Sequence, residues 1–166
     1  MPHVIDRLAT LRVADIMTTL VHTVGKNQTM SEVAADLVRH DLSSAPVVDE
    51  LGHCVGIITA SDFVKREGQL QQATDDMLIR EEGRAFRCVA VTGDYVGSHM
   101  TDAVQTIDAD ASLLKAARVM CSEHIHRLLV IDETHRPVGV ISTMDIVAAT
   151  VNVVDEMEQE SSRTEG

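Results

Sequence analysis

Aromatic residues are scarce in this chain of 166 residues: they make up 2% of it, and tryptophan is absent. The interior must therefore be built from aliphatic side chains, and a hydrophobic share of 45% is enough to form one. Few aromatic rings also means few of the stacking platforms on which proteins that bind single-stranded nucleic acids rely. The net charge of −12 produces a field that repels nucleic-acid phosphates and acidic membrane surfaces. We expect binding neither to nucleic acid nor to membranes.

Paired cysteines and long apolar runs are also missing. Cys54, Cys88 and Cys121 are odd in number and form no CxxC motif, so we expect them to be small buried hydrophobes. No run approaches the roughly 18 consecutive apolar residues that a membrane span needs. Residues 1–6 lack the basic stretch and apolar run of a secretory signal. These absences predict a soluble, cytoplasmic protein.

An internal repeat is the strongest positive signal. Gly56 and Gly139 lie 83 positions apart, and so do Asp62 and Asp145. The same offset carries the whole stretch 13–66 onto the second half of the chain without a gap. Because one register preserves the glycine, the acids and the apolar pattern together, the chain contains a duplicated unit.

Each copy predicts the same order of elements. Residues 18–24 and 101–107 read as short strands, and a helix follows, with a capping box at 29–32 in the first copy. Two β-branched runs joined by a hairpin turn come next, and then a second helix. The apolar faces of the first helices are predicted to include Val38 and Cys121. One such unit is too small to bury its sheet alone, so the two copies are expected to pack together.

The predicted fold class is therefore α+β (mixed α/β), with tandem β-α-β-β-α repeats. The predicted organisation is a lead-in helix over 1–12, a first repeat over 13–66, a helical linker over 67–95, a second repeat over 96–152 and a disordered acidic tail over 153–166.

The end of each repeat carries a polar motif with a specific chemistry. A strand ending in Thr59 or Ser142 delivers a hydroxyl to the start of a helix, where free backbone N–H groups suit a phosphate. Asp62 and Asp145 follow three residues later, and an ionised carboxylate can accept hydrogen bonds from the two hydroxyls of a ribose. The alternative is an ordinary capping box at the helix start. The presence of the motif in both copies favours a ligand site.

These repeats resemble the CBS (cystathionine-β-synthase) domain family. The resemblance rests on Val-x-x-x-Met-Thr, on Val-Val-Asp or Val-Ile-Asp, and on Gly-h-h-[Ser/Thr]-x-x-Asp (h, hydrophobic) at 56–62 and 139–145. It implies a pseudo-twofold pair with two clefts between the repeats and an adenosine-containing ligand in them. Such modules often form flat dimers, so a homodimer is expected. The residues that the family pattern assigns are Asp62 and Asp145 to ribose, Thr59 and Ser142 to phosphate, and Thr18, Ser44, Ala45, Pro46, Thr101 and Leu128 to adenine, mainly through their backbone.

The second repeat has an additional cation that the first lacks. His126 and Arg127 belong to a segment similar to the one with which the γ subunit of AMP-activated protein kinase contacts phosphate, and a guanidinium can bind phosphate oxygens in a bidentate manner. The alternative role of Arg127 is a surface salt bridge. The first repeat has residues 43–46 at the matching positions, with hydroxyls but no cation.

Together these patterns predict a non-catalytic regulatory module. The expected ligand is an adenine nucleotide, AMP, ADP or ATP, whose binding in a cleft between the repeats would signal to an effector protein in trans, as in energy sensing. The alternatives are a sensor of S-adenosylmethionine or NAD and a ligand-free scaffold for dimerisation or partner docking. No catalytic residues or catalytic cofactor are expected. No metal is expected either, because Cys121, His124 and His126, the only tight cluster, fall on different elements.

Overall fold

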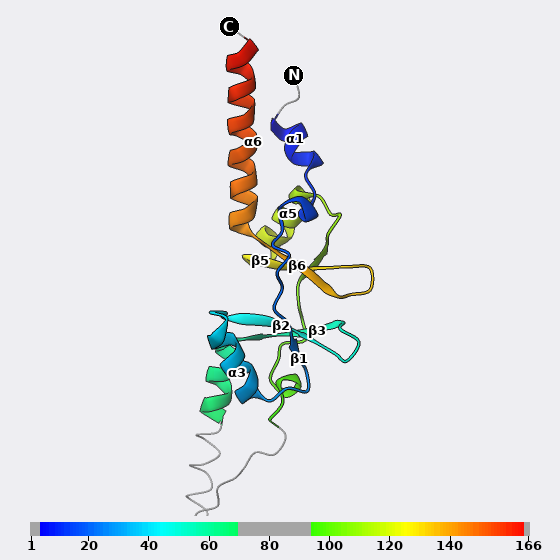
Figure 1. Cartoon of the computed structure of the whole chain (residues 1–166), viewed down its shortest axis with the longest axis vertical. Coiled ribbons are helices and arrows are strands. Elements are labelled where there is room, and N and C mark those ends of the chain that lie inside the picture. Colours follow the sequence, from blue (N-terminus) through cyan, green and yellow to red (C-terminus); the bar gives the residue numbers. More distant parts are fainter. Residues whose placement is uncertain (1–3, 70–93, 165–166) are drawn as a thin grey trace, which may run out of the picture. The chain divides into compact units, whose positions relative to one another are not determined.

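The computed structural model describes residues 4–69 and 94–164, and these divide into two compact units. Unit 2 is the continuous segment His22–Val104. Unit 1 combines two distant segments, Met1–Val21 and Gln105–Gly166. In Figure 1, unit 1 is therefore coloured blue at its first segment and green through yellow to red at its second.

Unit 2 contains a three-stranded sheet with strand order β1-β2-β3. Strand β1 (Val24–Gly25) runs parallel to β2 (Ser44–Val48), which pairs in antiparallel fashion with β3 (Cys54–Thr59). Helix α3 (Met30–Arg39) lies between β1 and β2 in sequence. A further helix begins at residue 60 and is described to residue 69, and the short 3-10 helix η1 (Val96–Ser98) follows.

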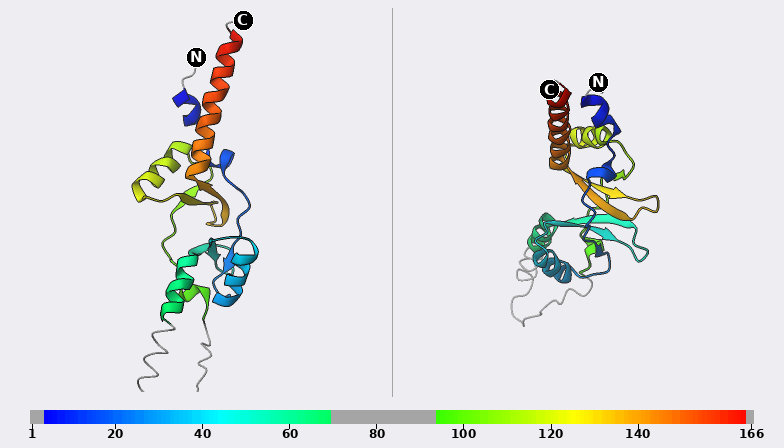
Figure 2. Two further views of the ribbon diagram at one scale, coloured as in Figure 1. Left: turned by 90° about the vertical axis from the view of Figure 1, so that its left-hand side faces the viewer. Right: turned by 45° about the horizontal axis from the view of Figure 1, so that its top comes forward.

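Unit 1 repeats this order. Strand β4 (Thr106–Asp108) is parallel to β5 (Arg127–Ile131), and β5 is antiparallel to β6 (Pro137–Ser142). Helix α5 (Leu113–Glu123) connects β4 to β5, and the long α6 (Thr143–Thr164) follows β6. The first segment adds α1 (Val4–Thr10), which packs against α5 and α6, and α2 (Val13–Ile16). These helices gather on one face of the sheet (Figure 2).

Local sequence explains where α3 begins and which face it buries. Thr29 accepts a hydrogen bond from the Glu32 amide, and the Glu32 carboxylate accepts one from the Thr29 amide, so the predicted capping box is confirmed. Met30, Val33 and Leu37 recur at helical spacing and are buried. Val38, which the pattern placed on the same face, is 81% exposed. The apolar stripe is therefore narrower than predicted.

The core is aliphatic, as the composition predicted. In unit 2, Val33, Val47 and Ile58 are fully buried, and in unit 1 Val130 and Ile141 are. No aromatic residue belongs to the fully buried cores of the described segments. Close packing of aliphatic side chains therefore fills the core, without stacking between aromatic rings.

The units do not coincide with the sequence repeats, because each repeat's Met-Thr leader pairs with the other repeat's strand. Thr18 and Val140 exchange two backbone hydrogen bonds of 2.9 Å, which adds residues of the first repeat to the edge of β6. Thr101 and Ile57 exchange the equivalent pair, of 2.9 and 3.0 Å, at the edge of β3. The leaders are thus exchanged between the repeats, and each covers a strand edge that would otherwise be open.

Glycines permit this exchange. An ideal Cβ built on Gly139 would lie 2.4 Å from Met17 Sδ, and one built on Gly56 would lie 2.6 Å from Met100 Sδ. Real Cβ atoms do not approach neighbours this closely, so each methionine occupies space that only a glycine leaves. The matching positions in the two repeats therefore have one shared packing role.

Several predicted boundaries differ from the structure. The strands expected over 18–24 and 101–107 are reduced to β1 and β4, because Thr18 and Thr101 are held by the isolated bridges instead. Helix α1 lies within the lead-in stretch 1–12, and a further short helix, α2, begins at Val13 inside the stretch predicted as the first repeat. Helix α6 continues to Thr164, through most of the stretch 153–166 expected to be disordered. It is supported there by burial of Val153 and by an ion pair from Arg7 to Glu156.

The cysteine prediction is wrong for Cys121, which is exposed on α5. Cys54 is half-buried in β3, and its thiol lies 3.6 Å from the Gly56 carbonyl oxygen. Cys88 and most of the linker predicted over 67–95 lie outside the described residues. No helix in the described part of the chain is long and apolar enough to span a membrane.

Candidate functional site

The predicted site residues of unit 1 meet at one end of the β5–β6 pair. In the antiparallel register Arg127 lies opposite Ser142, and Leu128 lies opposite Ile141. The backbone amide of Thr143 donates to the carbonyl of His126 at 3.0 Å, which fixes the start of β5 beside the start of α6. The hydroxyl of Ser142 and the guanidinium of Arg127 are therefore carried by neighbouring strand ends.

The predicted adenine contacts of unit 1 flank this end from two sides. Leu128 is buried, so its side chain belongs to the core and its contribution to a ligand would be made by the backbone. Thr18 lies beyond β6, and its hydrogen bonds with Val140 place the leader next to the strand that ends at Ser142. Six of the predicted site residues therefore belong to unit 1: Thr18, His126, Arg127, Leu128, Ser142 and Asp145.

One of the two carboxylate oxygens of Asp145 accepts hydrogen bonds at the start of α6. Its Oδ2 accepts hydrogen bonds from the Ser142 amide and hydroxyl, both at 2.7 Å. The Ser142 hydroxyl lies 3.3 Å from the Asp145 amide, so the capping box considered from the sequence is present. Oδ1 has no hydrogen-bond or ion-pair partner among the described residues. A carboxylate oxygen has two lone-pair positions, so Oδ1 can accept from two hydroxyls while Oδ2 caps the helix.

The cationic side of this site is open. Arg127 and His126 are both exposed. The surface salt bridge considered for Arg127 is absent: within the described segments its guanidinium has no acidic partner, although acids outnumber bases in the chain by 26 to 14. Arg127 and Ser142 are strand partners and Asp145 follows three residues later, so these side chains could together bind a ligand that carries both hydroxyls and negative charge.

Unit 2 places its predicted residues at the equivalent positions. Ser44 lies opposite Thr59 in the β2–β3 register, Ala45 lies opposite Ile58, and Pro46 lies opposite Ile57. Ala45 and Pro46 are buried, so only their backbone could contact a ligand. Thr101 is held beside β3 by Ile57, as Thr18 is held beside β6.

The carboxylate of Asp62, however, is fully engaged. Its Oδ2 accepts from the Thr59 amide at 2.9 Å and the Thr59 hydroxyl at 2.7 Å, and its Oδ1 accepts from Lys65 Nζ at 3.2 Å. Asp62 is only 5% exposed. Burial alone would raise the pKa of this carboxyl, but the hydrogen bonds from Thr59 and Lys65 outweigh it and hold the pKa below its ordinary value. The group is therefore ionised and already neutralised by a partner.

The two motifs are chemically unequal in a way that sequence reasoning missed. Lys65, three residues after Asp62, supplies a cation inside the first motif, whereas Ala148 holds the matching position after Asp145. The alignment of the two repeats already contains this difference. Asp62 and Lys65 could have been recognised in it as an i,i+3 ion pair on a helix. The unit 1 motif keeps a free carboxylate oxygen and a free guanidinium, and the unit 2 motif has neither.

Comparison with known proteins identifies the repeat. A model of the CBS domain matches residues 13–68 and 78–152 of the chain. An uncharacterised 17.7 kDa protein of Acidianus ambivalens is 26% identical over 142 residues, which cover 86% of this chain and 74% of that protein. Three of the curated relatives are enzymes, and the chain covers less than a quarter of each.

Solved structures share the fold. A CBS domain pair in complex with 5′-methylthioadenosine and S-adenosyl-L-methionine aligns with a TM-score of 0.63 at 26% identity, over 86% of this chain and 98% of that one. A Methanocaldococcus jannaschii protein, a candidate archaeal homologue of γ-AMPK, aligns with a TM-score of 0.67 at 28% identity. That alignment covers 85% of this chain and 48% of the other.

Proposed function

Because the chain belongs to the CBS domain family, we propose that it is a regulatory module that binds an adenosine-containing ligand through the unit 1 motif. The observation that carries the proposal is that Asp145 Oδ1 and the guanidinium of Arg127, the strand partner of Ser142, both lack partners among the described residues. The related CBS domain pair that binds two adenosyl compounds supports an adenosine ligand. No catalysis is proposed, since the motif offers binding groups and no nucleophile with an activating base.

The ligand we favour is an adenine nucleotide: AMP, ADP or ATP. Asp145 Oδ1 would accept the ribose hydroxyls, while Ser142, His126 and Arg127 would hold the phosphate. The adenine would lie against the backbone of Leu128 and the leader at Thr18, whose position beside β6 is fixed by its two hydrogen bonds. Arg127 is the reason to prefer a nucleotide, because a guanidinium binds phosphate oxygens with two parallel hydrogen bonds.

The unit 2 motif is proposed as a weaker site. A ribose there would have to compete with Lys65 for Asp62, and Ser44, before Ala45 and Pro46, stands where the second repeat has Arg127 to bind a phosphate. Thr59 and Thr101 are the other residues proposed for this weaker site. If only the stronger site fills as the ligand concentration rises, the module responds over one concentration range, as an energy sensor does. The bound ligand would favour one conformation, and an effector protein would bind that conformation. Placement of the ligand between the repeats, an effector in trans and a cytoplasmic location stay predictions.

A thermal-shift screen tests the proposal. The protein, shown to be ligand-free by mass spectrometry, is heated with AMP, ADP, ATP, NAD or S-adenosylmethionine. A ligand present at 100 times its dissociation constant is expected to stabilise the fold by about 2.7 kcal/mol. If none of the five shifts the midpoint of unfolding, the ligand proposal fails and the scaffold function takes its place.

The second candidate ligand, S-adenosylmethionine, is favoured by the related CBS domain pair that binds it. It has the ribose but no phosphate, so Arg127→Ala is expected to spare its binding while weakening that of a nucleotide by about tenfold or more. Titration calorimetry of both ligands with the wild type and the variant separates the two. Equal losses for both ligands would contradict the assignment of Arg127 to phosphate.

The homodimer is also proposed, from one face of α6. Met144, Val147, Val151 and Val154 are exposed, and their spacing of three, four and three residues is that of a helix which packs against another helix. A second copy of the chain presents the identical stripe and is the natural partner for it.

Val151→Glu is expected to convert this dimer to a monomer in light scattering coupled to size exclusion. Val38→Glu is the matched control, because Val38 is exposed on α3 and lies outside the stripe. A wild type that is monomeric, or a dimer that survives Val151→Glu, would refute the proposed interface.

A further inference from the structure

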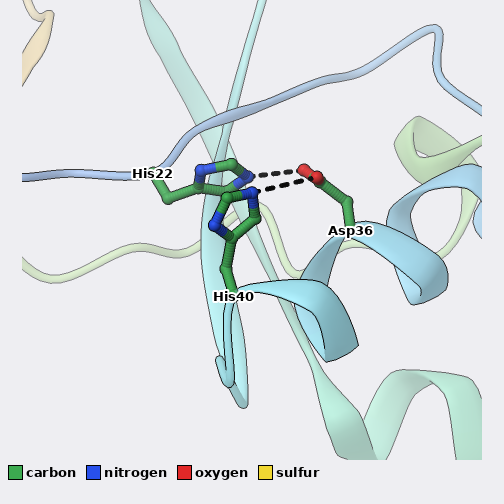
Figure 3. Close-up of side chains that lie close together, drawn as sticks. All are labelled: His22, Asp36 and His40. Atoms are coloured by element: carbon green, nitrogen blue, oxygen red, sulfur yellow. Dashed lines mark hydrogen bonds and ion pairs between the residues drawn. The ribbon is translucent and has the colours of Figure 1, made fainter.

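Three side chains of types that can bind a metal converge on unit 2, where α3 ends and the chain enters β1. Figure 3 shows the imidazoles of His22 and His40 directed toward the carboxylate of Asp36. His22 Nε2 lies 2.5 Å from Asp36 Oδ2, and His40 Nε2 lies 3.5 Å from Asp36 Oδ1. One donor atom from each of the three residues lies within 4.8 Å of the others.

The chain holds these residues from two elements. Asp36 is in the last turn of α3 and His40 is its C-cap, so the two are one helical turn apart and face the same side. His22 precedes β1, and its ring lies against that of His40 with centroids 4.4 Å apart. All three side chains are partly accessible to solvent, and that gives an ion a path to them.

We propose that His22, Asp36 and His40 form a binding site for a divalent transition metal ion of the zinc type. Two imidazole nitrogens and one carboxylate oxygen are a donor set that zinc accepts, with a fourth position left for water. Bonds of about 2.0 to 2.2 Å in a tetrahedral arrangement place the donor atoms about 3.3 to 3.6 Å apart. The spacing of 3.5 Å between His40 and Asp36 lies within this range, and the spacing of 2.5 Å between His22 and Asp36 would widen by about 1 Å through side-chain rotation.

A hydrogen bond joins His22 Nε2 to Asp36 Oδ2 in the metal-free cluster. A bound ion would take the place of the shared proton, because an imidazole nitrogen and a carboxylate oxygen are both donors that zinc accepts. Arg39 also approaches Asp36 Oδ1, at 3.3 Å, but its side chain is exposed and can turn away into solvent. The alternative is a metal-free network in which Asp36 simply accepts hydrogen bonds from its neighbours.

The position of His22 gives such a site a mechanical effect. His22 is the first residue of unit 2, directly after the last residue of the first segment of unit 1. An ion bound by His22 and by the end of α3 would fix this point of entry onto the helix. Metal binding would then reduce the freedom of the connection through which the chain passes from one unit to the other.

Titration of the tag-free protein with Zn²⁺ and with Co²⁺ tests the proposal. We expect one ion per chain, with cobalt absorption bands of a nitrogen- and oxygen-ligated ion and no sulfur charge-transfer band. His22→Gln and His40→Gln are each expected to weaken zinc binding at least about tenfold. His53→Gln is the control, because His53 forms a similar i,i+4 pair with Asp49, 3.4 Å apart, to which the described part of the chain adds no third ligand.

A second measurement observes the ligands themselves. In ¹⁵N spectra of the histidine rings, zinc should shift the signals of two histidines, which His22→Gln and His40→Gln assign. Zinc affinity that is unchanged in both variants, or that falls equally in His53→Gln, would overturn the proposal and leave the metal-free network. Circular dichroism confirms that each variant is folded.

Discussion

Asp145→Asn is expected to weaken binding of the adenosine ligand by about 10- to 150-fold, while Asp62→Asn changes it little. The first figure is the usual contribution of hydrogen bonds to a charged group, about 1.5 to 3 kcal/mol. The two variants are matched, because both carboxylates accept from the amide and hydroxyl of the strand's last residue. They differ in Oδ1, which is free in Asp145 and bound to Lys65 in Asp62.

Calorimetric titration with whichever adenosine compound gives the largest thermal shift measures this difference. Both substitutions weaken the hydrogen bonds at a helix start, at about 1 kcal/mol each, and Asp62→Asn also loses its pair with the exposed Lys65, which adds up to about 1 kcal/mol. A larger loss of affinity in Asp62→Asn than in Asp145→Asn would move the main site to unit 2. Equal binding by the wild type and both variants would show that the carboxylates have a capping role alone.

Gly139→Ala is expected to destabilise unit 1 by about 1 to 3 kcal/mol, although alanine normally suits a strand better than glycine does. The new methyl group would lie 2.4 Å from Met17 Sδ, 3.0 Å from Met17 Cγ and 3.2 Å from the backbone oxygen of Thr18. The methionine is flexible and can move, but the backbone oxygen is held by the Val140 amide. Urea unfolding monitored by circular dichroism measures the change.

Gly68→Ala is the control for this substitution, since a Cβ at Gly68 has nothing within 4 Å. It is expected to leave stability unchanged or to raise it by up to about 1 kcal/mol, because Gly68 lies within a helix. In a Met17→Ala background, Gly139→Ala should cost less than in the wild type, and the difference is the coupling between the two residues. If Gly139→Ala is as harmless as Gly68→Ala, the leader does not pack on β6 in solution.

The repeat, the order of elements and the capping boxes could all be predicted from the sequence, because they depend on local pattern. The contact between Ser142 and Asp145 follows from the geometry of a helix start over four residues. Two hydrogen bonds of 2.7 Å confirm it. The exchange of leaders could not be predicted in this way. It depends on backbone pairing between Thr18 and Val140, residues far apart in the chain, whose amides carry no sequence signal.

Other differences have equally specific causes. Cys121 was placed on a buried face by its neighbour Met120, but α5 buries a stripe that includes Met120 and excludes the residue after it. The acidic end of α6 reads as a solvated tail until α1 is present to pair with it through Arg7. The group of His22, Asp36 and His40 had one local signal, the spacing of Asp36 and His40, but its third member comes from another element.

The division of the chain has a consequence for synthesis on the ribosome. Unit 2 is complete once Val104 has emerged, whereas the opening segment of unit 1 must wait for Gln105–Gly166 before it has anything to pack on. During that wait Met17 and its neighbours are exposed apolar chain, tethered to a domain that has already folded. The contact of Arg7 with Glu156 joins residues 149 positions apart. Such non-local contacts form slowly, because the long loop between the residues must close first. A stalled or truncated product would therefore contain an intact unit 2 with an unpaired N-terminal strand segment, the form most prone to associate with another chain.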